Sequence, residues 1–505
     1  MRTAAKTAAL MAILTLGSKA MGFLRELFMA GFFGTSSITD AYVMASAIPG
    51  VIFAGIFTSV AVSYMPLFSE IVEKDGMEEG NRFTRESISL MSAIALLIII
   101  LGIIFSDQLV SIFAVGFAEE TAALTSFYLK IIFPTILFTA IIMLLTANLQ
   151  YKGVFLKPIL AGYLQSIFVL AAIIVSAYYS HYFLAIGLLV GSGFYAFAVG
   201  WVAKNNGFSF SPTLHFGGAA KKIVLLAIPV FIGSTVNQIN TFVDKMLASG
   251  LRECSVAALN YGNLLITLVS SMTITVIVTI IYPRLTQAIA REDYENFNDS
   301  VSKGMSITMI IGLPCSFGAM LYSYPAVQIV YERGAFDAAS TDLTSSAFFY
   351  YAIGLAFIAV NALLVKVYYS MQDMKTPVIC GIIGAATNIC LNLLLVGPMA
   401  HRGLALATSI AAIVNACLLY YWMRRKYPKV SIVTDWGKMG KILLSAVLAV
   451  GTSFGVYAPL MSIPSMVNIV ALGSAVLAAC LIYLILLKLF KIKELDLLKD
   501  VLKLK

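Results

Sequence analysis

The chain has 505 residues, of which 60% are hydrophobic and 12% are charged, and its formal net charge at pH 7 is +9. Soluble domains carry about 25% charged residues, so this composition excludes a soluble multidomain enzyme and a globular head on a single membrane anchor. We therefore expect an all-α polytopic membrane protein.

A bilayer core about 30 Å thick requires about 20 apolar residues per helix. The first apolar run follows a basic start but has no small-residue cleavage site, so we interpret it as a retained helix and not as a signal peptide. In chain order, such runs predict about fourteen transmembrane helices, with approximate spans 4–32, 38–66, 86–106, 122–148, 156–179, 182–203, 222–250, 255–283, 300–324, 342–370, 377–397, 403–423, 439–460 and 465–489.

The basic residues are distributed unevenly over the loops between these spans. With the N-terminus inside, the inner segments hold 26 Lys and Arg, whereas the outer loops hold Arg252, Arg333 and Arg402. This asymmetry predicts a multi-pass protein of the bacterial cytoplasmic membrane with both termini cytoplasmic. The positive net charge then reflects membrane topology, and we expect no nucleic-acid partner.

The sequence repeats itself at long range. Pro158 recurs as Pro377 at the start of a helix, and Pro66 recurs as Pro283 at the end of one. These and two further matches have nearly equal offsets in residue number. An even number of helices separates the copies, so the halves share one orientation, as in transporter folds with parallel repeats.

The repeat predicts two pseudo-symmetric six-helix lobes, at 1–215 and 216–430, and two extra C-terminal helices with a cytoplasmic tail at 431–505. Lobes of this kind enclose a central cavity that alternating access exposes to one side of the membrane and then to the other. A repeat kept only for packing is the alternative. We expect a monomer.

The first helix carries several polar residues on one face, including Ser18, Lys19, Arg25 and Glu26. A charge inside the bilayer costs several kcal/mol, so these residues predict a cavity that binds substrate. Asp40 on the next helix is added because it could reach Arg25. The alternative is a local ion-pair network between Lys19 and Glu26.

The shift that relates Pro158 to Pro377 also places Asp244 under Arg25 and Lys245 under Glu26. Asp244 shares one polar face of the corresponding helix with Asn237, Asn240 and Thr241, so this face offers oxygens where the first helix has cations. Oxygen ligands suit a hard cation. We therefore consider a sodium ion as a cofactor, with the candidate ligands Asp244, Asn388, Asn392 and Thr408. Ordinary interhelical hydrogen bonding by Asn and Thr is the alternative.

The sequence offers little support for an enzymatic activity. The six cysteines are scattered, with no metal-ligand spacing. The histidines His181, His215 and His401 fall at separate loops or helix ends, and the chain has no nucleotide-binding GxxxxGK[ST] loop. We expect a transporter driven by a gradient and no enzymatic activity.

Four segments resemble one known family. They are SKAMGFLRELFMAGFFGTSSITDAYVMA, YERGAFD at Tyr331–Asp337, YYSMQDMKTPV at Tyr368–Val378 and NLLLVGPMAHRGLALATS at Asn392–Ser409. They look like the MurJ/MviN lipid II flippases of the multidrug/oligosaccharidyl-lipid/polysaccharide exporter superfamily, from about residue 8 to the C-terminus. The resemblance implies a fourteen-helix fold that turns the pyrophosphate and sugar-peptide head of lipid II to the outer leaflet for cell-wall synthesis. It also implies that the polyprenyl tail slides along the last two helices.

The resemblance carries over residue by residue only in part. The family's basic positions on helix one match Lys19 and Arg25, and its acidic positions match Glu26 and Asp40. The proposed cation ligands resemble positions at which family members are thought to bind sodium. Where the family often has an arginine and a glutamate on helix two and an arginine on helix eight, this chain has Phe53, Thr58 and Asn263.

Losing two cavity cations weakens the expected hold on an anion, so either lipid II binds differently or the substrate differs. Two alternatives therefore stay open. The first is an exporter of another polyprenyl-linked oligosaccharide or of a drug. The second is a scaffold that gathers cell-wall enzymes without transporting anything.

Overall fold

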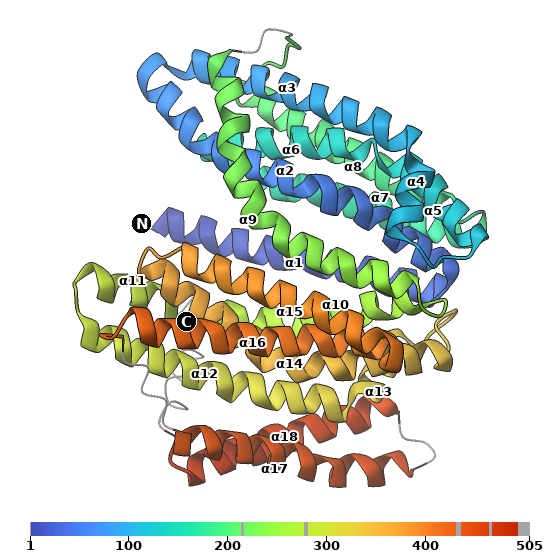
Figure 1. The fold of residues 1–505 in the computed structure, drawn as a ribbon, viewed down its shortest axis with the longest axis vertical. Coiled ribbons are helices and arrows are strands. Elements are labelled where there is room, and N and C mark those ends of the chain that lie inside the picture. Colours follow the sequence, from blue (N-terminus) through green and yellow to red (C-terminus); the bar gives the residue numbers. More distant parts are fainter. Residues whose placement is uncertain (1, 214–216, 277–280, 431–435, 464–466, 493–505) are drawn as a thin grey trace. The chain divides into compact units, whose positions relative to one another are not determined.

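The computed structural model describes residues 2–213, 217–276, 281–430, 436–463 and 467–492 (Figure 1). All the regular secondary structure in these ranges is helical. The helices are α1 (Arg2–Phe33), α2 (Ser37–Asp75), α3 (Met77–Ile104), α4 (Ser106–Phe113), α5 (Glu119–Ile132), α6 (Thr135–Tyr151), α7 (Leu156–Tyr178), α8 (Phe183–Asn205), α9 (Gly218–Ser249), α10 (Ser255–Val276), α11 (Tyr282–Ala290), α12 (Tyr294–Leu321), α13 (Ser323–Tyr331), α14 (Ala338–Ser370), α15 (Lys375–Met399), α16 (His401–Lys426), α17 (Trp436–Met461) and α18 (Asn468–Leu489).

Within the described residues, each of the fourteen predicted spans overlaps a helix or a pair of helices. Within the described ranges, 10 helical segments are long and apolar enough to cross a membrane. The polytopic helical fold is thereby confirmed, whereas the number fourteen stays a prediction. The short helices α4, α11 and α13 were not predicted, because elements of 8 or 9 residues fall below the length that a search for spans detects.

One predicted span, 122–148, is interrupted. α5 ends at Ile132 and α6 begins at Thr135, with Phe133 and Pro134 between them. Proline lacks the N–H that a continuous helix needs, and the backbone closes the turn with a bond from Ile136 N to Phe133 O of 3.0 Å. Together the two helices still form one membrane-length segment, Glu119–Tyr151.

The chain packs into two compact units. Unit 1 comprises Met1–Ala257 and Arg333–Phe336, and unit 2 comprises Ala258–Glu332 and Asp337–Lys505. The division into 1–215, 216–430 and 431–505 follows the sequence repeat and not the packing, and it stays a prediction.

The core of unit 1 contains a stack of aromatic rings that is hydrogen-bonded to neighbouring polar side chains. The ring of Tyr64 stacks on Phe68 and on Phe83, with centroid distances of 5.2 and 5.5 Å. Its hydroxyl lies 2.6 Å from the Thr84 hydroxyl, and Asn148 Nδ2 lies 3.4 Å from the Tyr64 hydroxyl. Because buried polar groups in a bilayer have no water to bond to, this network fixes α6 against α2 and α3.

The segment Arg333–Phe336 belongs to unit 1 through backbone contacts. Ala335 N donates to Gly31 O at the end of α1, at 2.8 Å. Gly334 has a φ of +59°, and a Cβ there would come within 2.2 Å of Gly31 O. Glycine is therefore required for this close approach, which explains the glycine of the YERGAFD segment.

Unit 2 builds its core around α14. Leu363, Leu364 and Val367 of that helix are fully buried among residues of α11, α12 and α16. α17 and α18 join unit 2 through a second cluster on α12, where the Tyr483 hydroxyl donates to Ile310 O at 2.9 Å. Other sides of α17 and α18 leave large apolar side chains exposed, including Leu444 and Leu481.

The helix bounds agree with the repeat. α3 and α12 are both 28 residues long, and their first residues are separated by the same offset as Pro66 and Pro283. The first residues of α7 and α15 are separated by the same offset as Pro158 and Pro377. The turns before α7 and α15 contain Gly153 (φ +75°) and Gln372 (φ +62°) at related positions. The two sequence copies thus fold into the same order of helices.

Candidate functional site

Four charged side chains on α1 and α9 interact electrostatically within unit 1, and we call Arg25, Glu26, Asp244 and Lys245 the charged quartet. Glu26 interacts with Arg25 and with Lys245, and Lys245 interacts with Glu26 and with Asp244. All four are half-buried. Their formal charges cancel, which lowers the cost of holding charge in two helices that the sequence predicts to cross the bilayer.

The charged quartet brings together residues that the repeat relates. The repeat pairs Arg25 with Asp244 and Glu26 with Lys245, and each pair has opposite charges. Lys245 was not among the predicted site residues. The same shift could have identified it, because a cation at the position related to an anion is the simplest way to neutralise both.

Ser18 and Lys19, the remaining residues of the predicted α1 face, lie closer to the N-terminus of the helix than Arg25 and Glu26 do. Ser18 is half-buried and Lys19 is exposed. Lys19 precedes Glu26 by seven residues, which is two helical turns, so both lie on one face. A substrate-binding role for Ser18, Lys19, Arg25 and Glu26 stays a prediction.

Asp40 performs a structural task in unit 1. Its side chain is 3% exposed, and its two oxygens accept hydrogen bonds from the backbone N–H groups of Cys254 (2.8 Å) and Ala257 (2.7 Å). These donors lie at the start of α10, where backbone N–H groups lack partners within the helix. The side chain thus caps α10, and contact between Asp40 and substrate stays a prediction.

Three of the proposed sodium ligands lie together in unit 2. Asn388 Nδ2 donates to Thr408 Oγ1 at 3.2 Å, and Asn392 Nδ2 donates to Asn388 Oδ1 at 2.8 Å. Both asparagines are fully buried. This chain of bonds joins α15 to α16, as the hydrogen-bonding alternative expects. Asp244 belongs to unit 1, and its membership of a sodium site with these residues stays a prediction.

The residues at which the chain departs from the family are described unevenly. The side chains of Phe53 and Thr58 lie outside the described part of the structure, and so does His215. Asn263 is exposed on α10.

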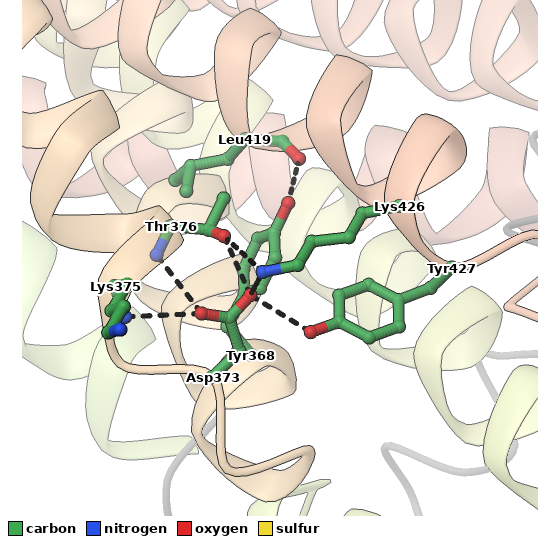
Figure 2. Close-up of polar contacts among 7 residues, drawn as sticks. All are labelled: Tyr368, Asp373, Lys375, Thr376, Leu419, Lys426 and Tyr427. Carbon is green, nitrogen blue, oxygen red and sulfur yellow. Dashed lines mark hydrogen bonds and ion pairs between the residues drawn. The ribbon is translucent and has the colours of Figure 1, made fainter.

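The turn between α14 and α15 forms a polar cluster in unit 2 (Figure 2). Asp373 is 7% exposed, and its Oδ1 accepts the backbone N–H groups of Lys375 and Thr376 at 3.1 Å each. Its Oδ2 accepts the Thr376 hydroxyl (2.6 Å), Lys426 Nζ (2.8 Å) and the Tyr427 hydroxyl (2.9 Å). One carboxylate therefore accepts the first backbone N–H groups of α15 and also binds side chains at the end of α16.

These bonds also set the protonation of Asp373. Burial by itself raises the pKa of a carboxyl, but the bonds from Lys426, Thr376 and Tyr427 outweigh burial and hold the pKa of Asp373 well below its usual range. The carboxylate is ionised at neutral pH. The QDMKTP segment was identified from its resemblance to the family, and its structural task became visible only from these contacts.

The family profile described as lipid II flippase MurJ matches residues 29–479. The probable lipid II flippase MurJ of Rhizobium meliloti (strain 1021) is 28% identical over 431 residues, which cover 80% of this chain and 78% of the relative. That of Buchnera aphidicola subsp. Schizaphis graminum is 29% identical over 428 residues, which cover 82% of each chain.

Solved structures agree with this relationship. A lipid II flippase MurJ in an inward closed conformation superposes with a TM-score of 0.83 at 25% identity, over 95% of this chain and 98% of that one. An inward-facing multidrug resistance MATE transporter of the MOP superfamily gives a TM-score of 0.67 at 14% identity, over 83% and 96%, which shows a shared fold. The family match and these helices together show that the chain belongs to the MurJ family of lipid II flippases.

Proposed function

We propose that this protein moves lipid II from the inner to the outer leaflet of the cytoplasmic membrane by alternating access. The observation that carries the proposal is the charged quartet, which includes an arginine on α1, a helix predicted to span the membrane, in a chain of this family. A guanidinium matches phosphate oxygens in a bidentate geometry. Arg25 is therefore the group that we assign to the pyrophosphate of the substrate.

The polyprenyl tail is assigned to α17 and α18. These helices lie outside the repeat, and between residues 442 and 487 they carry few polar side chains. Their exposed leucine, isoleucine and valine side chains can exchange contacts with lipid for contacts with an alkyl chain at little cost in free energy.

We further propose that the oxygens of Asn388, Asn392 and Thr408 hold a sodium ion in unit 2; the fourth predicted ligand, Asp244, belongs to unit 1 and stays a prediction. Amide and hydroxyl oxygens are suitable ligands for a hard cation. A bound cation would couple transport to an ion gradient, and no nucleotide or other cofactor is proposed.

The protein acts as a transporter and not as an enzyme in this proposal. Of the two described histidines, His401 Nε2 lies 2.8 Å from the Ser346 hydroxyl, and the backbone oxygen of His181 accepts the Tyr128 hydroxyl at 3.0 Å. These contacts join helices and loops within each unit. We place both termini in the cytoplasm, expect a monomer, and expect no nucleic-acid partner.

The test is a flipping assay with purified full-length protein in vesicles. Labelled lipid II placed in one leaflet should reach the other leaflet faster than in protein-free vesicles. A rate equal to that of empty vesicles would contradict the proposal.

A second candidate is export of another polyprenyl-linked oligosaccharide. Phe53, Thr58 and Asn263 favour it, because they stand where the family often has charges. Complementation of a strain that lacks its lipid II flippase separates the two candidates, since only a lipid II flippase restores growth.

A further inference from the structure

We propose that a cavity within unit 1, distinct from the charged quartet, binds the uncharged sugar part of the lipid-linked substrate. This inference rests on the proposed function. The cavity measures about 600 Å³, within the range of small-molecule sites, and it lies between α2, α6, α7 and α8. Its polar lining consists of Thr139, Thr146, Gln150, Gln165, Ser192 and Tyr195.

Several of these polar groups have spare bonding capacity. Thr146 Oγ1 is buried without a hydrogen-bond partner among the described residues. Gln165 Nε2 donates to Ser192 Oγ at 2.9 Å, which leaves the amide oxygen of Gln165 as an acceptor. Within a membrane-spanning unit, a polar group without a partner costs free energy unless water or a ligand satisfies it. The cavity therefore favours an occupant that hydrogen-bonds.

The wall that carries Thr146 and Gln150 is rigid. Asn148 lies between them on α6 and bonds on the other side to Tyr64 and Thr84, at 3.4 and 3.3 Å. α6 is thereby held in one orientation about its axis. A preorganised wall reduces the conformational entropy that ligand binding would otherwise cost.

The repeat shows that the fold does not require these polar residues. The shift that relates α7 to α15 makes Thr146 correspond to Val365 and Gln165 correspond to Gly384. The same helices therefore form in unit 2 without a hydroxyl or an amide at these positions. Apart from the Gln165–Ser192 bond between α7 and α8, the polar lining of unit 1 is then available to a ligand.

The chemistry of the lining selects a sugar. The described residues that line the cavity include no Asp, Glu, Lys, Arg or His, so the lining offers no cation to a pyrophosphate or to a peptide carboxylate. The other lining residues are apolar, among them Val62, Met65 and Met143. A sugar ring presents apolar C–H faces and uncharged hydroxyl and amide groups, which matches this mixture. An alkyl chain would leave the buried Thr146 hydroxyl without a partner.

The experiment compares two ligands that share tail and pyrophosphate and differ only in the sugar-peptide head. Binding of lipid II and of undecaprenyl pyrophosphate is measured by native mass spectrometry on purified full-length protein. Thr146→Val and Gln165→Leu remove one bonding group each. We expect the double variant to bind lipid II about tenfold more weakly, as expected for two lost hydrogen bonds, with undecaprenyl pyrophosphate binding unchanged.

Matched controls and a milder variant keep the result interpretable. Thr125→Val and Gln108→Leu repeat the chemical changes on α5 and α4, away from the cavity, and should leave both affinities unchanged. Tyr195→Phe removes only a hydroxyl and tests the site even where the double variant folds poorly. It should weaken lipid II binding alone.

The outcomes separate this inference from the proposed function. If wild-type protein binds lipid II and the cavity variants bind it equally well, the sugar site is wrong and the proposed function stands. Equal weakening of both ligands also overturns the sugar site. Wild-type protein that binds neither ligand contradicts the proposed function and this inference with it.

Discussion

The turn between α6 and α7 and the turn between α14 and α15 are related by the repeat, and they solve the same geometric problem differently. Gly153 reaches a left-handed φ of +75° without steric cost, whereas Gln372 adopts +62° with a side chain. In unit 2 the next residue, Asp373, accepts five hydrogen bonds. Its counterpart in unit 1 is Val154.

A second pair of sites that the repeat relates makes the same kind of hydrogen bond in both units. Asn81 on α3 donates to Gly207 O at 3.1 Å, just beyond α8. Asn298 on α12 donates to Lys429 O at 2.9 Å, just beyond α16. Duplicated helices therefore keep contacts that close each bundle, while the side chains at turns and inside the helices have diverged. Such divergent positions are where separate functions of the two halves are expected.

The largest effect is expected at Arg25. Arg25→Ala should abolish complementation of a lipid II flippase deletion at a normal protein level, because it removes the proposed phosphate ligand and leaves Glu26 without one of its cations. Arg25→Lys keeps the charge and should retain part of the activity. Normal growth with Arg25→Ala would show that the quartet does not bind substrate.

Asp373→Ala should destabilise the protein by about 2–4 kcal/mol, because it removes a helix cap and leaves the Lys426 and Tyr427 donors without their acceptor. Thermal unfolding in detergent measures this loss. Val154→Ala at the related turn removes only apolar contacts, so about 1 kcal/mol is expected. Equal losses at the two turns would contradict the contrast drawn between them.

The low pKa of Asp373 gives the turn of unit 2 a pH dependence that the turn of unit 1 lacks. A carboxyl whose pKa is lower in the folded state contributes stability above its unfolded value of about 4, and this contribution is lost as the pH falls toward the folded value. Wild type should therefore lose stability on acidification below about pH 4. Asp373→Asn should reduce this loss, and identical acid profiles would argue against the assignment.

Sodium should stabilise unit 2 through α15 and have no such effect through α7, the related helix of unit 1. Asn388 and Asn392 correspond to Val169 and Ile173, which are also buried. If the amides hold sodium, replacing choline by sodium should raise the melting temperature of wild type, because a ligand that binds the folded state stabilises it by mass action. Asn388→Ala should remove this increase and Val169→Ala should not. Wild-type melting that is the same in both salts would contradict a sodium site.

The smallest effect is expected at α17 and α18, the two helices outside the repeat. A photoreactive polyprenyl analogue should crosslink to residues within 442–487, since α17 and α18 offer apolar surface with few polar groups. Addition of unlabelled lipid II should reduce the crosslink. Labelling confined to α1–α16 would place the tail elsewhere.

The positions of the helices followed from the sequence because the bilayer imposes a local rule. A backbone inside lipid must satisfy its own hydrogen bonds, so each crossing requires an apolar helical segment of membrane length. The spans were readable from this rule, whereas the repeat and its offset were readable from matching residues such as Pro158 and Pro377. α4, α11 and α13 escaped it because they are too short to cross the bilayer.

Tertiary structure decided which polar side chains bond to one another. The sequence suggested that Asp40 could reach Arg25, and the bonds from its carboxylate to the start of α10 became visible only in the structure. Asp373 became prominent only through its contacts with Lys426 and Tyr427, which are distant in the chain. A hydrogen bond depends on the rotation and depth of two helices to within about an ångström, and hydropathy fixes neither. The sequence by itself therefore determined where the long apolar helices lie and that their order repeats, whereas packing decided which polar groups meet.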